Sequence, residues 1–273
     1  MSTSKIRPVI LWERGNEPKP RYGNRKPHAA LYQIINKKRN SYKKLLQKFL
    51  RFGKYLRSVP LKETRNKQEP CWINSFLPAL DAISLYSFIR SYQPKRYFEI
   101  GSGYSTRWAK KAIQDHGLST KITSIDPHPR TEVNRLCDVA IRRFLCDVDI
   151  KIFDQLKKGD VLFVDGSHRC FMNSDVAIFF LDILPRLKPG VLVQLHDICL
   201  PYDYPSAWKT KYYSEQYLLA VSLLARDPRI KIILPNSFIS HDSKLHGILS
   251  PLMRPLKRKG AHTHGASFWM EIV

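Results

Sequence analysis

Short apolar runs alternate with stretches of helical spacing over the last two thirds of the chain. Four of these runs cover residues 96–100, 121–125, 160–164 and 190–195, and each leads into polar or acidic residues at its end. Continuous apolar runs of this length are typical of strands buried on both faces of a parallel sheet. The pattern therefore predicts an α/β fold in which the strand ends form one polar edge.

Weaker patterns complete this sheet and its helices. Residues 140–145 are a further candidate strand, and residues 230–234 and 267–273 are predicted to form a closing antiparallel pair. Helical spacing covers residues 77–92, 106–114, 175–187 and 214–225, and a short helix is expected from Thr131. Residues 235–264 show no such pattern, so we expect a long, irregular, basic loop insertion there.

The first 70 residues differ from the rest. Residues 1–28 are rich in proline, glycine and charge, which is typical of a poorly ordered arm. From Leu31 to Leu56 apolar residues recur at helical spacing between lysines and arginines, with a break expected near Asn40. Such a helix either packs its apolar stripe on the following domain or docks on an anionic membrane or partner. We predict an N-terminal segment over 1–70 and a domain over 71–273.

Charge is distributed unevenly. The chain has 46 Lys+Arg against 23 Asp+Glu, a formal net charge of +23. Residues 1–70 hold 19 basic and 4 acidic residues, or +15, and the remaining 203 residues hold 27 and 19, or +8. Such a charge favours a nucleic acid, an anionic lipid surface or an acidic glycan as partner, the alternative being a solvated basic surface.

Neither targeting nor disulfide patterns are visible. No run of 18 apolar residues occurs, and the N-terminus lacks the apolar stretch of a secretory signal. The five cysteines form no C-x-x-C pair, which argues against a zinc knuckle or a disulfide framework. We expect no transmembrane segment and a cytoplasmic protein.

A glycine-rich turn follows the first strand. Gly101 and Gly103 stand between the apolar run and a helix-compatible stretch, so the backbone can turn sharply and a ligand can approach the helix N-terminus. Thr106 stands where a dinucleotide fingerprint has its third glycine, so pyrophosphate binding is not supported. Asp126 closes the second strand 23 residues after Gly103, a position suited to hydrogen bonds with ribose hydroxyls.

These pieces, with others in the same order, resemble the class I methyltransferases that depend on S-adenosylmethionine (SAM), and within them the methyltransferase-24 group. The matching pieces are residues 98–105, 124–129, 160–168, 187–198, 201–205, 215–219 and 265–269. The resemblance covers roughly residues 77–273. It implies a doubly wound, Rossmann-like sheet of seven strands with SAM across the strand ends, and the basic helical segment is an N-terminal extension to it.

The resemblance also implies a cofactor site. Its residues would be Glu99, Gly101, Ser102, Gly103, Tyr104, Ser105, Asp126, Pro127, Asp147, Asp165, Gly166 and Ser167. Within this set Asp126 would hold the ribose and Asp147 would reach the adenine amino group.

A second group of residues follows the fourth and fifth strands. Asp165, His196 and Asp197 are placed like the divalent-metal ligands of related O-methyltransferases, and oxygen and imidazole donors suit Mg²⁺ or Mn²⁺. The family's better-known sites have other pairs of residues where this chain has His then Asp. The alternative is catalysis without metal, with His196 or His168 as general base beside Asp197.

The first interpretation is therefore a SAM-dependent enzyme that methylates a hydroxyl of a small molecule or glycan. An RNA-directed methyltransferase is a second interpretation, motivated by the charge. A third is a non-catalytic SAM-fold binding protein tethered to an anionic partner. No RNA-recognition motif is visible in the chain.

Overall fold

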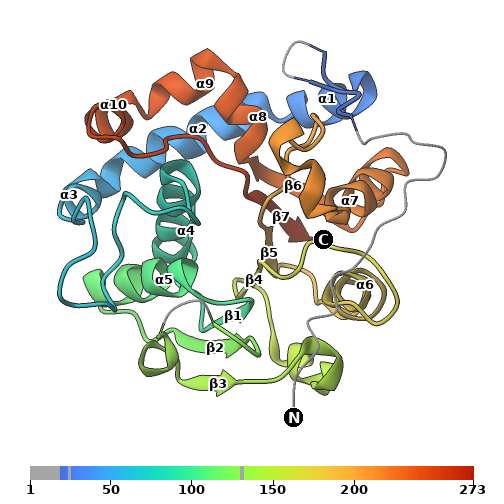
Figure 1. The fold of residues 1–273 in the computed structure, drawn as a ribbon, viewed down its shortest axis with the longest axis horizontal. Helices are drawn as coiled ribbons and strands as arrows, with labels where there is room; N and C mark the ends of the chain where they lie inside the picture. Colours follow the sequence, from blue (N-terminus) through green and yellow to red (C-terminus); the bar gives the residue numbers. More distant parts are fainter. Residues whose placement is uncertain (1–18, 24–25, 130–131) are drawn as a thin grey trace.

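A sheet of seven strands forms the centre of the computed structural model, which describes residues 19–23, 26–129 and 132–273 (Figure 1). The strands lie in the order β3-β2-β1-β4-β5-β7-β6. Their bounds are Arg96–Ile100 (β1), Lys121–Ile125 (β2), Val139–Ile141 (β3), Val161–Val164 (β4), Leu192–Leu195 (β5), Ile230–Pro235 (β6) and Phe268–Ile272 (β7). The first five strands are parallel, and β7 is antiparallel to both of its neighbours. The predicted seven-stranded fold class is thus confirmed.

The strand order determines where a ligand can bind. The chain starts in the middle of the sheet at β1, moves outward to β2 and β3, and returns to the other side of β1 as β4. The connections leaving β1 and β4 therefore diverge, which opens a crevice at the carboxyl ends of the two strands. β4 and β5 are buried at every position, as expected for strands with helices on both faces.

Ten helices flank the sheet in the described residues. They are Ala29–Asn36 (α1), Arg39–Phe49 (α2), Gly53–Arg57 (α3), Ala79–Tyr92 (α4), Tyr104–Asp115 (α5), Asp175–Ile178 (α6), Glu215–Leu224 (α7), Asn236–His241 (α8), Ser243–Ile248 (α9) and Ser250–Arg258 (α10). α4 is buried from Ala79 to Ile89 and packs beside α5, which covers one face of the sheet (Figure 1).

The N-terminal helices pack on the rest of the molecule. Leu31 and Ile35 on α1 and Tyr42 and Leu46 on α2 are buried in the same hydrophobic cluster as the sheet. Phe49 meets Phe88 of α4 edge-on, with ring centroids 5.4 Å apart. The predicted boundary at residue 70 therefore does not separate two hydrophobic cores. The apolar stripe of α1 and α2 is part of the same core as the sheet. The helix break lies at Lys37–Lys38, before the expected position near Asn40.

The expectation of an irregular insertion over 235–264 is wrong. Three helices, α8 to α10, occupy residues 236–258 and run beside α2 and α3 (Figure 1). Leu245, Leu249, Leu252 and Met253 are buried, at the spacing of one helical face. Pro251 stands in the first turn of α10, where a proline costs no hydrogen bond. Prolines and histidines obscured this pattern in the sequence.

Several smaller expectations also changed. The helix expected from Thr131 begins outside the described residues, and Asn134–Leu136 forms a single 3₁₀ turn. Most of the arm over 1–28 likewise lies outside the described part of the chain. The stretch 175–187 is helical but changes to π and then 3₁₀ geometry after Ile178. In the described residues no helix is long and apolar enough to cross a bilayer.

Candidate functional site

The turn after β1 brings two strand ends into contact. Gly101 has φ +78°, and a Cβ there would lie 1.9 Å from the carbonyl oxygen of Asp165 at the end of β4. The amide of Gly101 donates to Ile125 of β2, and the amide of Asp165 donates to Ile100, over 2.9 and 2.8 Å. Only glycine satisfies both the backbone angle and the close approach.

Asp126 holds the turn from the side of β2. Its Oδ2 accepts hydrogen bonds from the amide of Ser102 at 2.7 Å and from the Ser102 hydroxyl at 3.1 Å. Its Oδ1 accepts from the amide of His128 at 2.9 Å. The carboxylate is thus oriented by both segments it joins. A carboxylate has about four acceptor positions, so it retains capacity for ribose hydroxyls.

Glu99 lies beneath the turn, away from the cavity wall where the sequence placed it. It is fully buried, and it accepts hydrogen bonds from Tyr97 at 3.0 Å and from Thr106 in the first turn of α5. Burial raises the pKa of Glu99 to about 7, although hydrogen bonds from Ser105, Thr106 and Tyr97 oppose the rise. Glu99 therefore positions the start of α5 and does not line the site itself.

A cavity of about 550 Å³ opens at the ends of β1, β2 and β4. It is within the size range of pockets for small ligands and cofactors. Of the residues assigned to the cofactor, those that line it are Gly101, Ser102, Gly103, Tyr104, Ser105, Asp126, Pro127, Asp165, Gly166 and Ser167. Asp147 does not line it. A one-turn 3₁₀ helix, Leu145–Asp147, directs Leu145 and Cys146 to the cavity and leaves Asp147 exposed beside another hollow.

Two residues that precede α4, Phe76 and Leu77, also line this cavity. Phe76 stacks on Tyr104 with ring centroids 5.4 Å apart, and both side chains line the cavity. Glu63 accepts hydrogen bonds from the Tyr104 hydroxyl at 2.7 Å and from Arg107 at 3.1 Å. Hydrogen bonds from Tyr104, Lys67 and Arg107 lower the pKa of Glu63 to about 2. The cofactor residues assigned from the sequence include Tyr104 but neither Phe76 nor Glu63.

Side chains that follow β4 and β5 form a cluster of charged groups at the edge of the cavity. Nδ1 of His196 lies 3.3 Å from Asp165 and 3.4 Å from Asp197. Nε2 of His168 lies 3.1 Å from Asp165 and 3.8 Å from Asp197. The structure thus brings together the four residues that the sequence singled out. Asp165 also lines the cavity, so it connects this cluster to the cavity.

The charges in this cluster depend on one another. Burial by itself lowers the pKa of His168, but hydrogen bonds to Asp165 and Glu215 outweigh it and raise the pKa to about 10. Burial likewise opposes protonation of His196, yet the charges of Asp165 and Asp197 and contact with Asp81 hold its pKa well above the ordinary value. Burial disfavours the ionised form of Asp165, but the charge of His196 and a hydrogen bond from His168 keep its pKa low. These raised pKa values favour the positively charged imidazolium form of both histidines at neutral pH.

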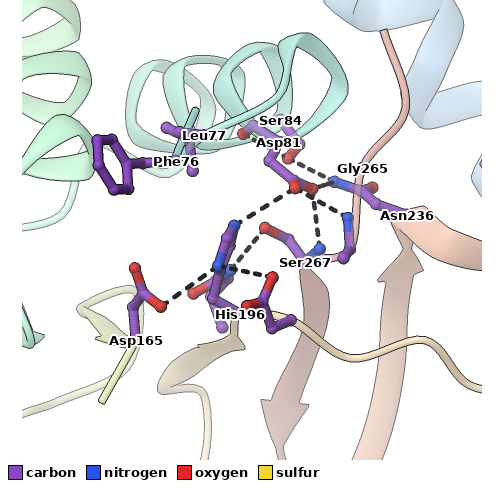
Figure 2. Close-up of polar contacts among 12 residues, drawn as sticks. Phe76, Leu77, Asp81, Ser84, Asp165, His196, Asn236, Gly265 and Ser267 are labelled. Carbon is purple, nitrogen blue, oxygen red and sulfur yellow. Dashed lines mark hydrogen bonds and ion pairs between the residues drawn. The ribbon is translucent and has the colours of Figure 1, made fainter. Parts of the chain in front are cut away.

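Two further acids, absent from the sequence-based assignment, complete the cluster. Glu215 at the start of α7 lies 2.9 Å from Nδ1 of His168. Asp81 of α4 lies 3.5 Å from Nε2 of His196 (Figure 2). It also accepts hydrogen bonds from Asn236 at 2.7 Å and from the amides of Ala266 and Ser267, both at 2.8 Å. The only signal for Asp81 was one acid within an otherwise apolar helical stretch.

The predicted metal ligands Asp165, His196 and Asp197 lie next to one another. In the part of the chain that the structure describes, no group of three or more His, Cys, Asp or Glu residues has the geometry of a metal site. Both ring nitrogens of His196 face carboxylates, Nδ1 toward Asp165 and Asp197 and Nε2 toward Asp81. Metal binding by these residues stays a prediction.

Comparison with known proteins identifies a family that matches part of this chain. Residues 98–198, which run from β1 through β5, match the family model described as a methyltransferase domain. No curated protein matches the sequence.

Among solved structures, three similar ones are described as complexes with SAH, the demethylated form of SAM. An O-methyltransferase from Bacillus cereus is 15% identical, with 84% of this chain and 90% of that chain covered and a TM-score of 0.42. A methyltransferase from Podospora anserina is 17% identical, covering 67% and 81%, with a TM-score of 0.40. A plantazolicin methyltransferase is 18% identical, covering 88% and 99%, with a TM-score of 0.40.

These structural similarities are too low to carry functional detail. The assignment depends instead on the matched region, the strand order and the position of the cavity. The match spans the glycine turn, Asp126 and the acids after β4 and β5, which are the parts of the chain that form the cavity and its edge. Residues 98–198 belong to the methyltransferase-domain family, and with this domain the chain is a SAM-dependent methyltransferase.

Proposed function

We propose that the enzyme transfers the methyl group to a hydroxyl of a small molecule or glycan. The observation that carries this proposal is the position of Asp165, which lines the cofactor cavity and contacts both His168 and His196. Methyl transfer to oxygen requires an in-line nucleophile and a group that takes its proton. Carboxylates and imidazolium groups at the cavity edge can bind and orient such a hydroxyl.

Asp197 is the proposed acceptor of the hydroxyl proton. Its side chain is 17% exposed, whereas that of His196 is 4% exposed and faces carboxylates on both sides. The raised pKa of His196 favours its imidazolium form, which carries a proton on both ring nitrogens and cannot accept another. Its role is to hold Asp165 and Asp197 in place and to balance their charge. His168 holds the other oxygen of Asp197 and is itself held by Glu215.

This proposal assigns no step to a metal ion, because both ring nitrogens of His196 face carboxylates. A metal-assisted reaction through Asp165, His196 and Asp197 would instead lose turnover in EDTA and regain it with Mg²⁺ or Mn²⁺. Turnover that EDTA leaves unchanged is the expected result. Loss and recovery would overturn the proton-transfer scheme.

The experiment uses SAM labelled in its methyl group, a panel of hydroxylated small molecules and oligosaccharides, and amine and RNA acceptors as competing classes. Label should appear on a hydroxyl. His196→Ala and Asp197→Ala should each lower turnover by about 10²-fold or more with little change in SAM affinity. Asp203→Ala, which removes an acid in the loop after β5, serves as the matched control. Label on nitrogen, or near-normal turnover in both variants, would contradict the proposal.

A further inference from the structure

The outer surfaces of α2, α3 and α10 carry several lysines and arginines and no carboxylates of their own, and Asp242 before α9 pairs with Arg39 of α2. Residues 18–62 contain no Asp or Glu, and neither do residues 243–270. Lys44 and Lys48 on α2, Lys54 on α3, and Lys257 on α10 are exposed. α3 packs against α10, so cations that are distant in the sequence face solvent on adjoining helices (Figure 1). No carboxylate from these helices offsets the charge.

An apolar slot of about 210 Å³ lies between α3 and α10 on this surface. Its buried lining includes Leu56, Trp72 and Leu252. Arg57 of α3 and Lys259 at the end of α10 stand beside these apolar side chains, and both are exposed. We name this feature, with its apolar lining and two flanking cations, the basic slot. The basic slot and the cofactor cavity share no lining residue, although Trp72 of the slot lies in the same loop before α4 as Phe76 and Leu77 of the cavity.

We propose that the basic slot and the cations around it bind the surface of an anionic phospholipid membrane. A phospholipid has the two chemical parts that the slot matches: an anionic headgroup for Arg57 and Lys259, and an acyl chain for the apolar lining. Lysines and arginines near an anionic bilayer each add a favourable contribution that salt screens. The apolar stripe of α1 and α2 takes no part, because it is buried in the core.

A nucleic acid is the main competing partner, and two features favour the membrane over it. Among the described residues, no large hydrophobic or aromatic side chain is exposed on α1, α2, α3 or α10, so bases have no stacking platform there. A nucleic acid also has no apolar chain that would fill a slot lined by leucine, proline and tryptophan. The slot is therefore the observation that separates the two classes.

The test measures co-sedimentation of the full-length protein with vesicles. Vesicles of phosphatidylcholine alone should leave it in solution, and vesicles that also contain phosphatidylserine should bind it in a salt-sensitive manner. Arg57→Glu combined with Lys259→Glu should weaken this binding by about tenfold or more. The matched control reverses two exposed cations on other elements, Lys151→Glu with Arg226→Glu, and should bind more tightly than the slot variant. Circular dichroism and SAH affinity verify that each variant is folded.

A second measurement tests the slot itself. Brominated phospholipids should quench the fluorescence of Trp72, because quenching requires an acyl chain close to the indole. The quenched fraction should fall in Trp72→Phe and remain in Trp208→Phe, which removes a tryptophan at a separate hollow. Equal binding of slot and control variants, or equal quenching in both tryptophan variants, overturns the proposal. Binding to a short RNA duplex that requires Arg57 and Lys259, without vesicle binding, would assign the surface to nucleic acid.

Discussion

The hydroxyl of Tyr104 donates a 2.7 Å hydrogen bond to the carboxylate of Glu63, 41 residues earlier in the chain. Tyr104 begins α5 and lines the cofactor cavity, whereas Glu63 lies in the segment between the N-terminal helices and α4. Arg107 joins the pair, since it contacts Glu63 and lies over the Tyr104 ring at 4.7 Å. The N-terminal part of the chain thus helps to shape the cofactor site.

Glu63→Gln should weaken SAH binding by roughly threefold to tenfold, the effect of losing about 1 kcal/mol of charge-assisted hydrogen bonding at a partly exposed site. Titration calorimetry measures it. Glu69→Gln is the matched control, because Glu69 belongs to the same segment but contacts Thr64. Equal affinity in both variants would show that the contact does not shape the cavity.

Gly101→Ala should destabilise the protein by more than 2 kcal/mol, because the new methyl group meets the carbonyl of Asp165 and φ is positive. Gly103→Ala is the control for this effect, since a Cβ there has no neighbour within 4 Å. Denaturant unfolding compares the two variants. Similar stabilities would mean that the approach of β1 to β4 is looser than described.

The apo protein should lose stability as the pH rises from about 4.5 to about 7. Burial raises the pKa of Glu99 from 4.5 when unfolded to about 7 when folded, so the folded state favours its protonated form. That advantage is complete at low pH and is lost as the pH passes the folded pKa. The shift corresponds to roughly 3 kcal/mol. Glu99→Gln should flatten the profile, and an unchanged slope would contradict the assignment.

Asp81→Ala should cost about 3–5 kcal/mol of unfolding free energy, because Asn236 and the amides of Ala266 and Ser267 lose their acceptor in a buried site. Ser87→Ala, on the same helix, removes a buried hydroxyl that has no hydrogen-bond partner, and it should have a small effect. Thermal unfolding of both variants gives the comparison. A loss of less than 1 kcal/mol in Asp81→Ala would mean that solvent reaches the network.

Leu46→Ala should destabilise the whole protein by about 2–5 kcal/mol, since Leu46 is fully buried in the shared core. Its exposed neighbour Gln47 provides the control, and Gln47→Ala should change stability little. Unfolding should remain a single transition. A separate early transition for α1 to α3 would restore the idea of an independent N-terminal segment.

The sequence by itself determined the sheet, the glycine turn and the acids at the strand ends. Parallel strands buried on both faces are read directly from apolar runs, and strand ends of a parallel sheet share one edge. That reasoning places Asp126, Asp165, His196 and Asp197 at this edge, where the structure has them. Glu99 and Asp147 do not line the cavity, because Glu99 is buried beneath the turn and Asp147 is exposed beside another hollow.

Only the tertiary structure decided which distant residues complete the site. Asp81 and Glu63 precede β1, and no local pattern connects them to His196 or Tyr104. The protonation of His196 is of the same kind, because it follows from three carboxylates that come from α4, β4 and β5. An amphipathic pattern indicates that the apolar face of a helix must be buried, but it does not indicate which partner buries it. The apolar stripe of α1 and α2 therefore left both docking and core packing open, and the fold shows α1 packed against α7 and α2 against α4.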